Sequence, residues 1–150
     1  MELILWRHAE AEDSFPDMDR ALTKKGQQQA NAMATFLNSH LPLDTGILVS
    51  PARRTQQTAH ALGRSFLTVP SISPGCSPQD ILHAANWPDE NGCVLVVGHQ
   101  PTLGEVAGLL MTGQPQYWSV KKGAVWWFSH RERGGDEQTI LRLSISPDYI

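Results

Sequence analysis

Short apolar runs alternate along the chain with stretches in which apolar residues recur every three or four positions. The clearest runs of strand length cover residues 3–6, 46–49 and 93–97. A helical spacing begins at Leu103, from which apolar residues stand at i+3, i+4, i+7 and i+8. Strands that alternate with helices are typical of a parallel sheet joined by crossover helices. The pattern predicts an α/β fold, a three-layer α/β/α sandwich with a mostly parallel central sheet.

Capping residues set the expected bounds of the helices. Thr23 is a suitable N-cap for a helix that runs through about Ser39. Ser50-Pro51 has the form of a cap followed by proline at the first helical position, which predicts a helix ended by Gly63. Shorter elements are expected as a strand at residues 66–69 and a helix at residues 78–86.

The end of the chain predicts an antiparallel hairpin at a sheet edge. Its strands are expected at residues 125–128 and 140–145, and the linker between them contains Gly134-Gly135. Period-two alternation in the second strand places Leu141, Leu143 and Ile145 on one face. The same rule directs Trp126 and Trp127 to opposite faces, one of them toward the core.

Composition narrows the classes of protein. With 150 residues and a net charge of −3, the chain is expected to form one domain, 1–150, with no nucleic acid or anionic membrane as its main partner. The apolar run at residues 3–6 is too short for a signal peptide or a membrane span, so we expect a cytoplasmic protein. Cys76 and Cys93 are interpreted as free thiols, and a monomer is favoured.

Three of the predicted strands end in polar residues of a related kind. Arg7-His8 follows the first, a segment that contains Arg53-Arg54 follows the second, and Gly98-His99 follows the strand at residues 93–97. The carboxyl ends of parallel strands lie at one edge of a sheet, where open α/β proteins bind ligands. Because helix N-termini and arginine forks favour phosphate oxygens, the sequence predicts a pocket for a phosphoryl group. Arg54 supports this, since a cation in the first helical turn is unfavourable unless an anion compensates it.

Four segments in order resemble the histidine phosphatase superfamily, also called phosphoglycerate mutase-like. They are LWRHAEA at residues 5–11, DRALTKKG at 19–26, SPARRTQQTA at 50–59 and VVGHQP at 96–101. The similarity is greatest to the short SixA-type branch of phosphohistidine phosphatases, which lacks a large capping insertion. The resemblance implies a minimal phosphoglycerate mutase-like fold.

The resemblance also implies roles for five residues. His8 matches the nucleophile that takes the phosphoryl group, and Arg7 and Arg54 match the arginines that hold its oxygens. His99 matches the second histidine, which donates to the phosphate, and Arg20 matches an arginine that faces the anion in the short branch. These implied roles describe phosphoryl transfer without a metal or other cofactor. Attack by His8 needs one ring nitrogen with a free lone pair, so we expect its other nitrogen to donate to a backbone carbonyl.

One departure from the wider family bears on the substrate. Residues 71–78 contain no Asp or Glu, whereas many ester-cleaving members carry a proton donor in this segment. An alkoxide leaving group needs such a donor far more than the imidazole of a phosphohistidine does. The missing acid therefore favours a phosphoramidate substrate. The resemblance to the short branch, which lacks a capping insertion, implies a phosphorylated protein of the histidine phosphotransfer type.

Two alternatives remain open. Glu10, Glu12 or Asp80 could act as the acid, which would make the protein a phosphomonoesterase for a small phosphorylated substrate. A non-catalytic phosphate- or phosphoprotein-binding module is the other. The pairs Lys24-Lys25 and Lys121-Lys122 are interpreted as solvated charges, although the first pair could extend the positive rim near Arg20.

Overall fold

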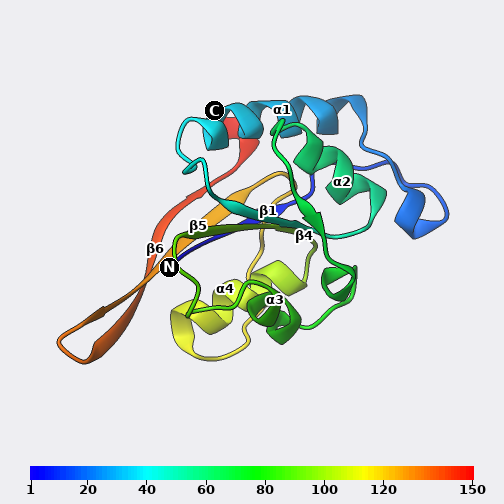
Figure 1. The fold of residues 1–150 in the computed structure, drawn as a ribbon. Coiled ribbons are helices and arrows are strands. Elements are labelled where there is room, and N and C mark those ends of the chain that lie inside the picture. Colours follow the sequence, from blue (N-terminus) through cyan, green and yellow to red (C-terminus); the bar gives the residue numbers. More distant parts are fainter.

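The computed structural model describes residues 1–150 and contains one six-stranded sheet (Figure 1). The strand order is β3-β2-β4-β1-β5-β6, in which β1 to β4 are parallel and β5 and β6 are antiparallel additions beside β1. The strands are β1 (Glu2–Arg7), β2 (Gly46–Val49), β3 (Leu67–Thr68), β4 (Cys93–Gly98), β5 (Val125–Arg133) and β6 (Asp136–Ile145). The helices are α1 (Lys24–Asn38), α2 (Arg53–His60), α3 (Pro78–Ala84) and α4 (Thr102–Thr112).

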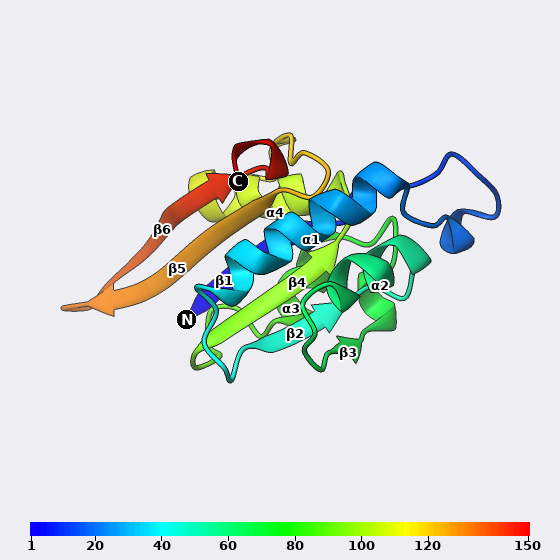
Figure 2. The same ribbon diagram turned by 90° about the horizontal axis from the view of Figure 1, so that it is seen from above.

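Helices cover both faces of the sheet, so the predicted three-layer sandwich is confirmed (Figures 1 and 2). Alternate residues of β1 serve the two faces: Ile4 and Trp6 join the core under α1 and α2, whereas Leu3 and Leu5 join the core over α3 and α4. All four side chains are fully buried. A central strand buried on both faces explains why residues 3–6 read as a continuous apolar run. None of the helices combines the length and the apolar character needed to cross a bilayer.

The expected helices form, with one different beginning. Thr23 caps α1, because its hydroxyl accepts from the Gly26 N–H at 2.9 Å. The second helix begins at Arg53, with Ala52 as an N-cap whose side chain makes no hydrogen bond, so the predicted Ser50 cap is wrong. The Ser50 hydroxyl instead lies 3.3 Å from the Ala52 nitrogen and 2.7 Å from Nε2 of His99.

The hairpin is longer than expected and contains a bulge. Its strands continue to a turn at Gly134-Gly135, and the pairing shifts between Trp127 and Phe128. Phe128 pairs with Leu141 and Trp127 with Leu143, which leaves Arg142 as the extra residue. Leu141 therefore packs on the α3–α4 side, while Leu143 and Ile145 pack on the α1–α2 side. The prediction that these three residues share a face is wrong.

Candidate active site

Three chain segments meet at the carboxyl edge of the sheet. Arg7 lies opposite Gly98 in the β1–β4 register, and the His8 N–H donates to the Gly98 carbonyl at 3.1 Å. On the other side of β4, the Ser50 N–H donates to the Val97 carbonyl at 3.2 Å. The three strand ends that the sequence singled out are thus neighbours.

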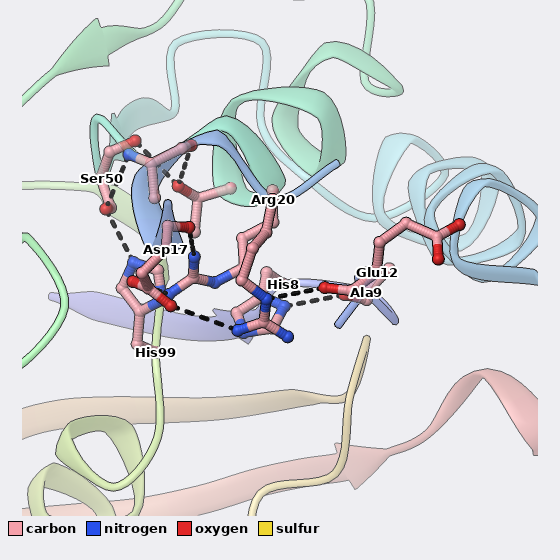
Figure 3. Close-up of polar contacts among 10 residues, drawn as sticks. His8, Ala9, Glu12, Asp17, Arg20, Ser50 and His99 are labelled. Carbon is pink, nitrogen blue, oxygen red and sulfur yellow. Dashed lines mark hydrogen bonds and ion pairs between the residues drawn. The ribbon is translucent and has the colours of Figure 1, made fainter. Parts of the chain in front are cut away.

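His8 is a buried, neutral imidazole with one ring nitrogen engaged in a hydrogen bond. Its Nδ1 lies 2.7 Å from the Ala9 carbonyl oxygen, which can only accept, so Nδ1 carries the proton and Nε2 keeps its lone pair (Figure 3). Burial lowers the pKa of His8 to about 3; the hydrogen bond to Ala9 opposes this shift, and the guanidinium groups of Arg54, Arg7 and Arg20 add to it. The ring is therefore unprotonated near neutral pH.

His99 lies beside His8, with ring centroids 5.4 Å apart. Burial lowers the pKa of His99 to about 3, and the proximity of His8 and Arg54 contributes to the shift. Because Ser50 Oγ accepts from Ala52, its own proton can go to Nε2 of His99, which leaves the imidazole proton on Nδ1. That buried Nδ1 has no hydrogen-bond partner.

The arginines reach the same place from two elements and a loop. Arg54, buried in the first turn of α2, donates from Nη1 to the Asp17 carbonyl at 2.8 Å and lies 3.2 Å from its carboxylate. Arg20 donates from Nε to the Glu12 carbonyl at 2.7 Å and pairs with the other Asp17 oxygen at 3.3 Å (Figure 3).

Arg7 is half-buried and donates from Nη1 to the Val120 carbonyl at 2.9 Å. Burial lowers the pKa of Arg7, and the nearby charge of Arg54 acts in the same direction. Its buried Nε has no partner, as is also true of Nε of Arg54. Together with Nδ1 of His99, three buried nitrogens around one site lack hydrogen-bond partners, an arrangement that suits a bound oxyanion.

Asp17 is the site residue that the sequence reasoning missed. Its carboxylate bridges Arg20 and Arg54. Burial raises the pKa of Asp17, but Arg54 and Arg20 together more than offset that effect and hold it below its usual value. The only signal in the sequence was its position three residues before Arg20.

The segment after Arg54 fixes the loops around the site. Gln57 accepts the Leu22 N–H on Oε1 at 2.7 Å, and the Thr58 hydroxyl accepts the Ala9 N–H at 3.1 Å. The Arg-x-x-Gln-Thr spacing thus places one guanidinium in the site and two acceptors beneath it. Gln57 and Thr58 held no predicted role.

Two of the three carboxylates considered as acids are engaged in other interactions, and the third, that of Glu12, is not bound to the site. Glu10 accepts the Thr23 hydroxyl at 2.8 Å, and Asp80 accepts the Ser77 N–H at 2.9 Å in the capping box of α3. Glu12 contributes its backbone carbonyl to Arg20, and its side chain makes no hydrogen bond. None of the three carboxylates contacts a histidine or arginine of the site.

Comparisons with known proteins show the family of this chain. Residues 3–75 match the histidine phosphatase superfamily (branch 1). A phosphohistidine phosphatase SixA homolog of Haemophilus influenzae is 34% identical over 127 residues, covering 73% of this chain and 77% of that protein. An uncharacterized protein of Picosynechococcus sp. is 35% identical over 138 residues, covering 83% and 82%.

The fold is also shared with solved structures. The protein histidine phosphatase SixA complexed with tungstate matches with a TM-score of 0.79 at 23% identity, covering 99% of both chains. The sequence match and the arrangement of His8, Arg54 and His99 at one sheet edge lead to the same assignment. This chain belongs to the histidine phosphatase superfamily and is a phosphatase of the SixA type.

Proposed function

We propose that the protein hydrolyses phosphohistidine on a phosphorylated protein, through a phosphoryl group carried on His8. The observation that carries the proposal is the Nδ1 contact of His8 with the Ala9 carbonyl, which leaves Nε2 unprotonated. A neutral nucleophile among three arginines can attack a phosphoryl group whose charge those arginines disperse. The SixA relatives described above support the same substrate class.

In the first step, Nε2 of His8 attacks phosphorus, and a new N–P bond forms as the substrate's N–P bond breaks. The departing imidazole keeps the electron pair and takes a proton from solvent. Arg7, Arg20 and Arg54 hold the phosphoryl oxygens, for which Arg20 and Arg54 release Asp17. Nδ1 of His99 donates to one oxygen. Water then attacks phosphorus, which releases inorganic phosphate and restores His8.

The leaving group explains why no strong acid is needed. Asp17 is the carboxylate nearest the arginines, and those arginines keep it ionised at neutral pH, so it is a poor proton donor. A phosphohistidine leaves as imidazole, for which such a donor matters little. An alkyl ester lacks that advantage, and general acid catalysis is worth roughly 10²–10⁴-fold.

A second candidate function rests on Asp17 itself. If substrate oxygens displace its carboxylate from both arginines, Asp17 loses the positive charges that lower its pKa and gains the negative charge of the phosphate, which raises it. A proton taken up by Asp17 could then pass to an alkoxide. The protein would then be a phosphomonoesterase for a small molecule, and Asp17, not Glu10, Glu12 or Asp80, would be the proton donor.

The test compares a phosphohistidine-bearing protein with aryl and alkyl phosphates, all in EDTA. We expect kcat/KM for phosphohistidine to exceed that for the alkyl ester by at least about 100-fold. Asp17→Asn should leave phosphohistidine turnover within a fewfold of wild type. Equal or better turnover of alkyl esters, lost in Asp17→Asn, would favour the esterase.

His8→Ala should abolish turnover, whereas His60→Ala, which changes an exposed histidine of α2, should keep it. Circular dichroism would show whether both variants are folded. Phosphate binding by the wild type without any turnover would instead support a binding module.

A further inference from the structure

A second, mainly polar cleft adjoins the phosphoryl pocket. It holds about 380 Å³ and is bordered by Arg7, Glu10, Lys25, Gln29, Lys121 and Lys122, with the turn at residues 146–148 closing one side. Arg7 belongs to both the pocket and the cleft. No step of the proposed reaction uses the three lysines.

The sheet topology explains why the cleft lies beside the pocket. Trp6 of β1 pairs with Val125 of β5, which pairs with Ile145 of β6. The end of β1, the beginning of β5 and the end of β6 therefore lie at the same edge of the sheet. The phosphoryl pocket lies over the ends of β2, β4 and β1, and the cleft continues over β1, β5 and β6.

The loop that carries Lys121 and Lys122 is bound to the residues of the pocket. Its Val120 carbonyl accepts from Arg7 at 2.9 Å, its Gly123 N–H donates to the His8 carbonyl at 3.0 Å, and the Gly123 carbonyl accepts from the Trp6 indole at 3.1 Å. The positions of both lysine backbones are thus fixed relative to the nucleophile.

Lys25 is fixed in a similar way from the other side. The Thr23 N–H donates to the Glu10 carbonyl at 3.0 Å, and Glu10 donates its own N–H to Gln29 at 3.0 Å. Gly26 packs so closely on this loop that a Cβ would lie 2.0 Å from the Glu10 oxygen. The first turn of α1 therefore holds Lys25 against the loop that follows His8.

The cleft carries an uncompensated positive charge. Four cations line it against two carboxylates, Glu10 and Asp148, although the whole chain has a net charge of −3. None of the three lysine ammonium groups forms a hydrogen bond or an ion pair, because neither carboxylate reaches them. Exposed, unpaired ammonium groups beside a phosphoryl pocket attract further anionic groups of the same substrate.

We propose that this cleft, defined by Lys25, Lys121 and Lys122, binds carboxylates on the protein surface that surrounds the phosphohistidine. The inference rests on the proposed function and gives it a source of selectivity among phosphoproteins. Lysine suits this task because a compact charge on a flexible stem tolerates carboxylates in varied positions. The open, mainly polar lining fits acidic side chains better than it fits an apolar peptide.

The test measures affinity, so that turnover is not required. Two peptides carry the same non-hydrolysable phosphonate analogue of phosphohistidine, one flanked by glutamates and the other by glutamines. Fluorescence anisotropy at low salt should give at least about tenfold tighter binding of the acidic peptide, a preference that weakens at 0.5 M salt. The triple variant Lys25→Gln, Lys121→Gln, Lys122→Gln should lose most of the preference.

A matched triple variant removes the same charge elsewhere. Arg131→Gln, Arg133→Gln, Arg142→Gln changes three exposed cations of the β5–β6 hairpin that do not line the cleft, and it should keep the preference. Equal affinity for both peptides, no binding of either, or an equal loss in the two triple variants would overturn the inference. So would binding of phosphoglycolate as tight as that of the acidic peptide, because a small carboxylate would then suffice.

Failure of the proposed function has a different signature. If the wild type does not hydrolyse phosphoimidazole or phosphohistidine peptides, the proposed function is wrong. The affinities of the analogue peptides still decide whether the cleft binds carboxylates.

Discussion

The imidazole of His8 is kept neutral by burial and by the arginines that would hold its substrate. Arg54, Arg7 and Arg20 all lower the pKa of His8, so the charge that attracts a phosphoryl group also keeps the nucleophile unprotonated. The contact with the Ala9 carbonyl opposes this shift but orients the ring. The same arginines thus form the proposed phosphoryl site and lower the pKa of the nucleophile.

In the proposed mechanism, Asp17 competes with the substrate for two of these arginines. Asp17→Asn removes the competing charge, so tungstate or inorganic phosphate should bind about two- to fivefold more tightly, the range expected for a half-exposed ion pair. Isothermal titration measures the change, and Asp13→Asn, at an exposed position without an ion pair, serves as the control. Unchanged or weaker binding in Asp17→Asn would contradict this role.

In the proposed mechanism, Ser50 is a positioning residue that acts through His99. Loss of its hydroxyl in Ser50→Ala removes the hydrogen bond to Nε2 and with it the preference for a proton on Nδ1. We expect kcat to fall about tenfold, as for the loss of one buried hydrogen bond of about 1.4 kcal/mol, with little change in KM. Ser50→Thr, which keeps the hydroxyl, should restore most of kcat. A change in KM alone would argue against this role.

At the scale of elements, apolar spacing predicted where strands and helices lie but not their local irregularities. The bulge at Arg142 moves Leu141 to the face opposite Leu143, and period-two alternation contains no signal for it. The beginning of α2 differed for a related reason. Ser-Pro is a common helix start, yet here the Ser50 hydroxyl is engaged with His99, a residue 49 positions away. Helix-capping propensity considers only the backbone groups near Ser50 in sequence, so it cannot predict a hydrogen bond to a distant residue.

The junction between α1 and the loop after β1 depends on a close backbone approach. A Cβ at Gly26 would lie 2.0 Å from the Glu10 carbonyl oxygen, so Gly26→Ala must separate the helix from this loop. We expect a loss of about 1–3 kcal/mol in the free energy of unfolding, measured by urea denaturation. Gln27→Ala, at the exposed neighbouring position, should be nearly neutral. Equal effects of the two substitutions would show that the contact is not critical.

On the scale of the whole molecule, the site joins the ends of three strands to one long loop. The parallel topology made the convergence of His8, Arg54 and His99 predictable, because each follows a strand of the same sheet. Asp17 was not predictable in this way, since it lies in a short turn whose position depends on tertiary contacts with Arg20 and Arg54. The second cleft was equally hidden, because its lysines come from opposite ends of the chain.

Two buried neutral histidines make stability depend on pH. The pKa values of His8 and His99 are about 3 in the folded state against 6.5 for the free side chain, so the unfolded state binds more protons below pH 6.5. The free energy of unfolding should therefore fall as the pH drops from 6.5 toward 3, by up to about 1.4 kcal/mol per pH unit for each histidine. Urea denaturation between pH 7.5 and 4.5 measures the slope. His8→Gln should reduce the slope by the contribution of one histidine, up to about 1.4 kcal/mol per pH unit. An unchanged slope would contradict the burial of a neutral ring.

The central claim is that the phosphoryl group passes through His8. Rapid quenching into alkali during turnover of a phosphohistidine protein, followed by mass spectrometry of the peptide that contains residues 1–20, detects an N-linked phosphoryl group directly. We predict an acid-labile phosphoryl group on His8 that forms and decays at rates compatible with kcat. Turnover with an unmodified His8, or with the phosphoryl group on another residue, would contradict the account.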